Sequence, residues 1–285
     1  MTELEEIARQ TLPQPAADAN KFSRGKLELV AGSARFPGAA ALAARASQRM
    51  GAGYTEIVCA PESVVPVWLA SPALVVRSWE DWSAAALPAS RPGKPFAVCV
   101  GPGFDAEDAA EADLLFEVLE AAHCPVIVDG GALSFLCQKR ALRYLERRFV
   151  EGLETVITPH GGEAARLVDA WELDASLQGA ELAQALARAF GVVVALKGPV
   201  TYLADDERVL AMDEGTPALA KAGTGDVLAG MVGALLAQGA PAFDAVACAA
   251  LLHARAGRAA AEALTDIGVA ADDVVESIPA AIRTL

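Results

Sequence analysis

The sequence predicts an α/β protein, a single domain built on a doubly wound, mostly parallel β-sheet covered by helices on both faces. Short apolar runs alternate with helical stretches along nearly the whole chain of 285 residues. Most of these runs are β-branched and bounded by Gly or Pro, as expected of strands that are buried on both faces. No internal repeat interrupts the pattern, and this length is compatible with one α/β domain.

The elements follow from these runs in chain order. Buried parallel strands are predicted at 27–31, 55–59, 96–100, 126–129, 155–158 and 192–196. Helices are predicted between them at 39–50, 107–122, 162–170 and 179–190. The runs 200–203 and 208–212 flank Asp205-Asp206-Glu207 and indicate a hairpin at one edge of the sheet. Helices at 227–238, 243–263 and 272–285 complete the chain, whereas the Ala- and Pro-rich segment 83–94 is expected to be a loop.

Composition excludes several classes of partner. The formal net charge of −14 argues against nucleic acid and against an anionic membrane surface. No apolar run reaches the ~18 residues that a membrane span requires, and the acidic N-terminus lacks the apolar region of a secretory signal. The five cysteines show no Cys-x-x-Cys spacing, so we expect reduced thiols in a cytoplasmic protein rather than disulfides or a zinc site.

The most informative motif is Gly223-Thr224-Gly225-Asp226, which opens an apolar helix. Amides in the first turn of a helix have no intrahelical partner, and the dipole is positive there, so this turn is a candidate anion site. Asp226 is placed to accept a proton from a hydroxyl that attacks a phosphorus atom. The alternative is an Asp that only stabilises the helix dipole. Because the chain has further polar segments at strand ends, we favour catalysis.

These further segments follow the predicted strands, and ligands of such sheets bind beyond the carboxyl ends of the strands. They are Gly32-Ser33 with Pro37-Gly38-Ala39-Ala40, Gly101-Pro102-Gly103, Asp129-Gly130-Gly131, Thr158-Pro159-His160-Gly161-Gly162-Glu163 and Lys197-Gly198-Pro199-Val200-Thr201. Asp129 ends an apolar strand, and a buried carboxylate there needs a partner. We therefore predict one composite site at this edge of the sheet.

Taken in order, these motifs resemble those of the ADP-dependent NAD(P)H-hydrate dehydratase family of the ribokinase-like superfamily. The Thr158-Pro159-His160 element, with Glu163, distinguishes that family from ordinary sugar and vitamin kinases. The resemblance implies a ribokinase-like domain over residues 21–285, preceded by a helical lead-in at 1–20. Gly130-Gly131 departs from it, because many relatives carry a second acidic residue after the Asp, and Ala222 replaces a common glycine.

The resemblance implies a metabolite-repair lyase that dehydrates (S)-NAD(P)H hydrate, called NAD(P)HX, to NAD(P)H. ADP, or alternatively ATP, would phosphorylate the hydrate hydroxyl, and phosphate would then be eliminated. It also implies Mg²⁺, both NADHX and NADPHX as substrates, a homotetramer, and a separate epimerase acting in the same pathway. Neither nucleic acid nor a membrane is expected as a partner.

The same resemblance assigns roles to individual residues. The catalytic group is Asp226 with the anion site formed by Gly223, Thr224 and Gly225. Glu163 would contact Mg²⁺ only indirectly. NAD(P)HX would contact Ala39, Ala40, Gly103, His160 and Asp226. The ADP or AMP moiety would contact Lys197, Gly198, Pro199, Val200, Thr201 and Gly225.

Each of these residues also has a purely structural interpretation. His160 could cap the helix at 162–170, and Glu163 could be a first-turn acid of that helix. The segment 197–201 could be a tight turn between strands, and the small residues at 38–40 could serve close packing. His253 lies mid-helix among apolar residues and is interpreted as a satisfied core histidine. His123 is interpreted as a helix-end residue, so neither is a site candidate.

Two other functions compete with the dehydratase. A ribokinase-like kinase for a vitamin precursor or sugar would share Asp226 and its anion site, and would release a stable phosphoester. A nucleotide-binding sensor without catalysis would bind nucleotide and show no turnover. Thr158-Pro159-His160 argues against the kinase, and the intact pair of Asp226 and Glu163 argues against the sensor.

Overall fold

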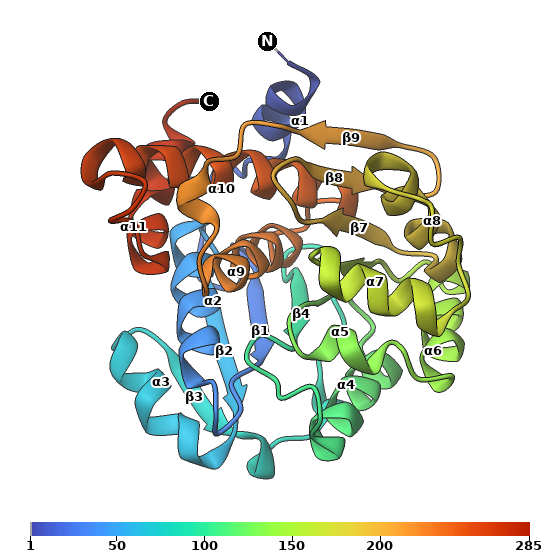
Figure 1. Ribbon diagram of the computed structural model, residues 1–285. Coiled ribbons are helices and arrows are strands. Elements are labelled where there is room, and N and C mark those ends of the chain that lie inside the picture. Colours follow the sequence, from blue (N-terminus) through green and yellow to red (C-terminus); the bar gives the residue numbers. More distant parts are fainter. Residues whose placement is uncertain (1) are drawn as a thin grey trace.

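The computed structural model describes residues 2–285 and contains one nine-stranded sheet. The strand order is β3-β2-β1-β4-β5-β6-β7-β8-β9. Pairing is parallel from β3 through β7 and antiparallel from β7 to β9. Helices cover both faces of the sheet (Figure 1). The predicted doubly wound, mostly parallel sheet is therefore confirmed, together with the added edge hairpin.

The strands are short, and those at the centre of the sheet are buried. Their bounds are β1 Lys26–Val30, β2 Tyr54–Cys59, β3 Val75–Ser78, β4 Phe96–Val100, β5 Val126–Val128, β6 Thr155–Ile157, β7 Val193–Leu196, β8 Thr201–Ala204 and β9 Val209–Met212. The α-helices are α1 Glu3–Thr11, α2 Pro37–Arg49, α3 Val64–Ala70, α4 Ala109–Ala121, α5 Ala132–Phe135, α6 Arg140–Val150, α7 Gly161–Ala170, α8 Gly179–Phe190, α9 Thr224–Ala237, α10 Ala242–Leu264 and α11 Ala271–Ile282. Short 3₁₀ turns lie at Pro61–Ser63, Trp79–Asp81, Ala84–Ala86 and Pro217–Leu219.

Some elements were absent from the sequence prediction. The edge strand β3 was missed because it is only four residues long and none of them is fully buried. Helix α6 was missed because its arginines mask a narrow apolar stripe, in which Ala141 and Leu145 are the buried apolar positions. The predicted loop at 83–94 contains a 3₁₀ turn. Helix α9 begins at Thr224, three residues before the predicted start.

The core lies in two layers, one on each face of the sheet. One layer packs α2, α9 and α10 against the sheet, with α1 and α11 packed on these helices, and the other layer packs α4 to α8 against the opposite face. All five cysteines are free, as expected, and four of them are buried. Within residues 2–285, no helix combines the length and the apolar character needed to cross a bilayer.

Helix α9 is buried along almost its whole length and approaches α2 closely. A Cβ atom at Gly230 would lie 2.1 Å from the Ala43 carbonyl oxygen, which belongs to the α2 backbone. Gly233 likewise faces Leu27 of β1 at 3.0 Å. These glycines let α9 lie directly on the sheet and on α2, and this contact fixes where the Gly223–Asp226 turn begins.

A buried guanidinium anchors the amino ends of the central strands. Arg148 of α6 has no exposed surface. It donates to the carbonyl oxygens of Ala122, Cys124 and Glu154 at 2.6, 2.8 and 3.1 Å, and to Thr155 Oγ1 at 2.9 Å. Burial lowers the pKa of Arg148 to about 10. These donors tie α6 to the segments that enter β5 and β6.

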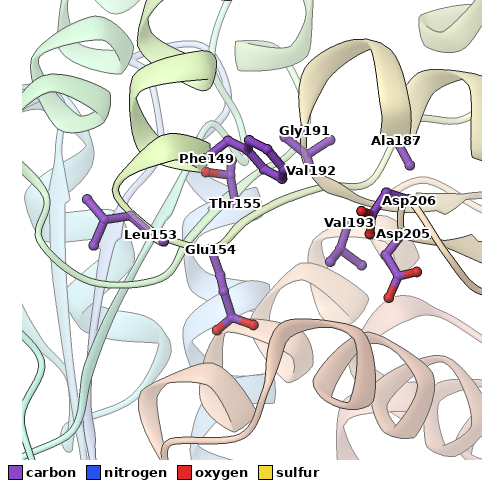
Figure 2. Close-up of a pocket in the computed structure, with 11 residues that line it drawn as sticks. Phe149, Leu153, Glu154, Thr155, Ala187, Gly191, Val192, Val193, Asp205 and Asp206 are labelled. Carbon is purple, nitrogen blue, oxygen red and sulfur yellow. The ribbon is translucent and has the colours of Figure 1, made fainter.

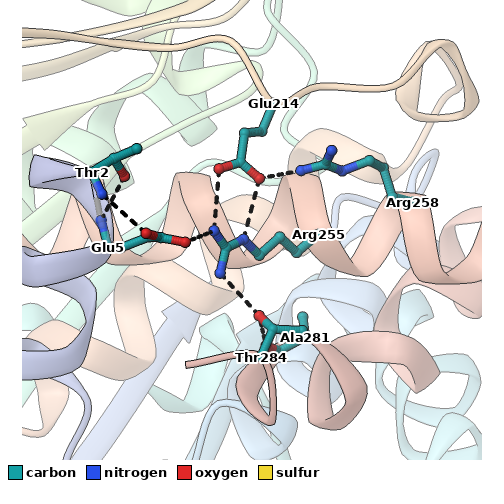
Figure 3. A network of polar contacts seen from close by, with 7 residues as sticks. All are labelled: Thr2, Glu5, Glu214, Arg255, Arg258, Ala281 and Thr284. Atoms are coloured by element: carbon teal, nitrogen blue, oxygen red, sulfur yellow. Dashed lines mark hydrogen bonds and ion pairs between the residues drawn. The ribbon is translucent and has the colours of Figure 1, made fainter.

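The two ends of the chain meet on α10 through Arg255 (Figure 3). Its guanidinium donates to Glu5 Oε1 of α1 at 2.6 Å, to Glu214 at 3.2 Å and to Thr284 Oγ1 at 3.0 Å. Arg258 also pairs with Glu214. Glu214 lies in the segment that leads from β9 to α9, so α10 holds both the chain ends and the approach to the Gly223–Asp226 turn.

The close approach of α9 to α2 makes a direct prediction. Replacement of Gly230 by Ala should lower the free energy of unfolding by about 1–3 kcal/mol, because the added methyl overlaps the Ala43 carbonyl. In an exposed helix the same change would stabilise by about 1 kcal/mol. Urea unfolding of Gly230→Ala measures the effect. The matched control is Gly38→Ala in α2, where a Cβ meets nothing within 4 Å. Equal stability of the two variants would contradict the close contact.

Candidate active site

The predicted segments meet at the carboxyl edge of the sheet, where the strand order reverses between β1 and β4. Gly103 has a φ of +73°, and a Cβ there would lie 2.5 Å from the Phe36 carbonyl oxygen and 2.9 Å from the Ala39 Cβ. A Cβ at Gly32 would meet the Ala40 Cβ at 2.9 Å. The structure thus brings Ala39, Ala40 and Gly103 together at the start of α2.

Asp129, at the end of β5, has the partner that its burial requires. Its Oδ1 accepts a hydrogen bond from Lys197 Nζ at 2.9 Å and another from the Thr158 hydroxyl. Side-chain exposure is 3% for Asp129 and 19% for Lys197, so the ion pair is largely shielded from water. The pKa of Lys197 is raised, because the Asp129 and Glu163 charges outweigh the cost of burial. This pair joins β5, β6 and β7 at the site.

His160 caps α7, as the structural interpretation expected. Its Nδ1 accepts from the amides of Gly162 at 2.9 Å and Glu163 at 3.3 Å, and the Glu163 carboxylate accepts from the His160 amide at 2.8 Å. Because Nδ1 accepts, the proton of the neutral ring lies on Nε2. The Nε2 atom lies 3.4 Å from Glu163 Oε1, and 57% of the side chain is exposed. Capping therefore orients His160, and the exposed edge of its ring faces solvent beside Glu163.

The Gly223–Asp226 turn forms the N-terminus of α9. Gly223 is the N-cap, with a φ of +93° that favours glycine, and its Cα lies against Leu42 of α2. The Thr224 hydroxyl donates to the carbonyls of Leu219 at 2.8 Å and Lys221 at 2.9 Å. A Cβ at Gly225 would lie 3.4 Å from Lys197 Nζ. Among the described residues the Thr224 amide donates to the Lys221 carbonyl at 3.4 Å, whereas the Gly225 and Asp226 amides have no partner and lie near the Lys197 ammonium, as a polyanion site requires.

Electrostatics set Asp226 apart from an ordinary carboxylate. Burial is the main cause that raises its pKa from 3.8 to about 7, and the negative charges of Asp129 and Glu163 add to it. The Lys197 charge opposes the shift. Burial also raises the pKa of Glu163. A carboxyl group that titrates near neutrality is suited to general-base catalysis, since it can both accept and release a proton.

A groove borders the segment 197–201. It has a volume of about 530 Å³ and lies between the start of α8 and the turn from β7 to β8. Its lining comprises Gln178, Gly179, Ala180, Glu181, Pro199, Val200 and Tyr202. Sequence reasoning identified Pro199 and Val200 but not the α8 residues or Tyr202. The α8 residues lie far from the motif along the chain, and Tyr202, which directly follows Thr201, falls in a strand where an aromatic residue is no signal of a site.

A second cavity, of about 220 Å³, lies at the opposite edge of the sheet (Figure 2). Phe149, Gly191 and Val192 line it together with Glu154, Asp205 and Asp206. The Glu154 carboxylate accepts from the Ala242 amide at 2.8 Å and so caps α10. None of the predicted site residues lines this cavity, so it is separate from the candidate active site.

The described residues, 2–285, contain no cluster of three His, Cys, Asp or Glu side chains that could ligate a metal ion. Lys197 already occupies Oδ1 of Asp129. Gly130 and Gly131 supply no side-chain ligand beside it. Any divalent cation at this site would be held mainly by phosphate oxygens and water, which suits Mg²⁺.

Because the pKa of Asp226 is raised, replacing its carboxyl group by a neutral amide should stabilise the folded protein, and the gain should depend on pH. The folded-state pKa of about 7 exceeds the unfolded value, so stability is lost as pH rises from about 4 to 7. Asp226→Asn should therefore raise the free energy of unfolding by about 2–4 kcal/mol at pH 8.5 and by little at pH 4.5. Urea unfolding at both pH values tests this. Asp206→Asn, at an exposed acid, controls for loss of one charge; an equal effect of Asp226→Asn at both pH values would contradict the assignment.

The buried ion pair makes a separate prediction. Lys197→Met should lower the free energy of unfolding by about 3 kcal/mol, because it leaves Asp129 buried without its charge partner. Adding Asp129→Asn should recover most of that loss. A double-mutant cycle by urea unfolding measures the coupling. Arg35→Met removes one partner of the more exposed pair with Asp105, and should cost less than about 1 kcal/mol. Additive effects of the Lys197 and Asp129 changes would show that the pair is not coupled.

Comparison with known proteins identifies relatives of this site and fold. The family model for NAD(P)H-hydrate dehydratase matches residues 27–280. An ADP-dependent (S)-NAD(P)H-hydrate dehydratase from Xanthomonas campestris is 32% identical over 98% of this chain and 95% of its own length. The crystal structure of an ADP/ATP-dependent NAD(P)H-hydrate dehydratase from Bacillus subtilis, co-crystallised with ATP and Mg²⁺, is 29% identical. It aligns with a TM-score of 0.81 over 98% of this chain and 96% of that one.

The fold comparison agrees. A ribokinase-like superfamily protein from Enterococcus faecalis aligns with a TM-score of 0.80 over 98% of this chain and 94% of its own, at 23% identity. That similarity bears on the fold alone, and it confirms the ribokinase-like architecture expected from the sequence. Because the family model spans nearly the full length and the Xanthomonas relative matches end to end, the chain belongs to the NAD(P)H-hydrate dehydratase family.

Proposed function

We propose that the protein catalyses nucleotide-dependent dehydration of (S)-NAD(P)H hydrate to NAD(P)H, a metabolite-repair reaction, with ADP as phosphoryl donor. The single observation that carries the proposal is the placement of Asp226. A carboxyl group with a pKa of about 7 lies in the first turn of α9, beside unpaired amides and the Lys197 ammonium. Family membership supplies the substrate class, and this geometry supplies the chemistry.

Asp226 would act as general base on the hydrate hydroxyl. Its carboxylate accepts the hydroxyl proton as the oxygen attacks the terminal phosphorus of ADP, and the bond from that phosphorus to the bridging oxygen breaks to release AMP. The resulting phosphate ester has a better leaving group than hydroxide. The ring nitrogen lone pair expels phosphate, and loss of a proton from the adjacent ring carbon restores the dihydronicotinamide. No external oxidant or reductant is needed.

The hydrated dinucleotide would occupy the start of α2. Ala39 and Gly103 are partly exposed small residues there, and Ala40 is buried beside them where the backbones approach one another closely. His160 presents the exposed edge of its ring from the neighbouring strand end, oriented by its two amide contacts through Nδ1 and by Glu163 beside Nε2. We propose that these four residues bind NAD(P)HX and that they hold the hydroxyl near Asp226.

The donor nucleotide would occupy the segment Lys197-Gly198-Pro199-Val200-Thr201 and extend to Gly225. The groove of about 530 Å³ beside this segment offers room for the adenosine portion. The Gly223, Thr224 and Gly225 amides would face the phosphates, and the Lys197 charge would offset theirs. ADP is the proposed donor, and ATP is the alternative that the same pocket would admit.

Mg²⁺ is proposed as the accompanying metal ion. It would neutralise charge on the donor phosphates. Since the described residues offer no three-ligand cluster, the contribution of this chain would be indirect. Glu163 would face the hydration shell, held in place by its contact with the His160 amide. We also propose a homo-oligomer, a tetramer by family resemblance, and a separate epimerase that supplies the competent hydrate epimer.

An absorbance assay tests the proposal. Purified protein mixed with Mg²⁺, hydrated NADH and either ADP or ATP should restore the absorbance of reduced nicotinamide only when a nucleotide is present. The rate should rise with pH through about 7 as Asp226 ionises. Asp226→Asn should lower kcat by about 100-fold or more while the nucleotide still binds.

Matched substrates and variants sharpen the result. Hydrated NADPH measured in parallel establishes whether both substrates are accepted. Asp206→Asn, on the distant hairpin, should keep the activity of the unmodified protein. A phosphorylated product that persists without recovery of absorbance would support a kinase instead. Nucleotide binding without any turnover would support a sensor.

A further inference from the structure

His253 is a buried histidine whose hydrogen bonding is incomplete, contrary to the satisfied core residue expected from the sequence. It lies in the middle of α10 with 8% of its surface exposed. Its Nε2 is buried and has no hydrogen-bond partner among the described residues. A buried polar atom without a partner costs free energy, so its presence between the buried residues Leu252 and Ala254 calls for an explanation.

The surroundings of His253 connect it to the Gly223–Asp226 turn. The backbone of Thr224, in the first turn of α9, lies within interaction range of the ring, and the Lys197 charge acts on it as well. One helical turn further along the same face of α10, a Cβ at Gly257 would lie 2.7 Å from Leu219. The Leu219 carbonyl is the oxygen that accepts the Thr224 hydroxyl. This face of α10 therefore supports the turn from behind.

The ring is also held neutral. Burial lowers the pKa of His253 to about 4, and the nearby Lys197 charge acts in the same direction. A neutral imidazole can offer one donor and one acceptor without repelling Lys197. A Lys or Arg at this position would add a buried positive charge beside Lys197, and an apolar residue would offer no hydrogen bond.

We propose that His253 is a positioning residue for the phosphoryl donor: its buried imidazole supports the first turn of α9 from behind and so holds the amides of that turn toward the donor phosphate. The residue acts through the Thr224 backbone and does not contact the reacting atoms. The inference rests on the proposed function, because the ligand concerned is the phosphoryl donor of that reaction.

Isothermal titration with ADP and Mg²⁺ tests this against a purely structural role. His253→Leu keeps a similar volume and removes the unpaired nitrogen, so stability should be unchanged or higher. The Kd for ADP should nevertheless rise about five- to tenfold, and kcat should fall. His253→Gln, which retains a hydrogen-bonding group, should recover part of the affinity. Cys248→Ala, on the α10 face toward Ala8, controls for general loosening of the helix. Unchanged ADP affinity in His253→Leu would overturn the proposal.

A second measurement uses the unmodified sequence. The chain has three histidines, so ¹⁵N-histidine labelling gives a spectrum with few signals, and His253→Gln identifies the one from His253. Addition of ADP and Mg²⁺ should shift the His253 ring resonances. ADP binding without that shift would overturn the inference and leave the proposed function intact. Absence of ADP binding to the unmodified protein would instead remove both.

Discussion

The packing of α9 against the sheet is the contact on which the rest of the structure depends. This helix is buried almost from end to end and touches α2, α10, β1 and β4. Gly230 and Gly233 remove the side chains that would hold it away from Ala43 and Leu27. Because the helix cannot shift without breaking close contacts on several sides, its first turn is held in a defined place over the strand ends. The position of Asp226 is a consequence of that packing.

The site holds three carboxyl groups close together, although repulsion between like charges disfavours the folded state. Asp129, Glu163 and Asp226 share the influence of one ammonium group, that of Lys197. Asp129 takes the direct contact, and burial raises the pKa values of the other two carboxyl groups against the opposing effect of the Lys197 charge. Such a cluster of charged groups is typical of a site that binds a cation or a phosphate-bearing ligand. The folded protein is less stable with these charges than it would be without them. His253 adds an unpaired neutral group to the same arrangement.

The sequence was sufficient for the sheet, since β-branched runs mark the buried strands, and the polar motifs that follow their ends lie at one edge of that sheet in the structure. It was insufficient for β3, whose residues are half exposed, and for α6, whose apolar stripe is narrow. The pairing of Asp129 with Lys197 joins residues 68 positions apart, and a carboxylate in a sequence does not reveal its partner. His253 was misread because apolar neighbours indicate burial and cannot show whether a ring nitrogen is bonded.

The buried Arg148 makes the amino ends of β5 and β6 more rigid than their carboxyl ends. Its guanidinium binds four oxygen atoms around the entries to β5 and β6, where each strand begins. At their other ends, the same two strands are joined by one carboxylate, that of Asp129, which accepts hydrogen bonds from Thr158 and Lys197 among polar turns and glycines. The amplitude of thermal motion in β5 and β6 should therefore be smaller at the ends held by Arg148 and larger at the turns that follow the strands. The strand entries would then stay in place when a ligand binds, and the turns at the carboxyl ends of the strands would make the adjustment.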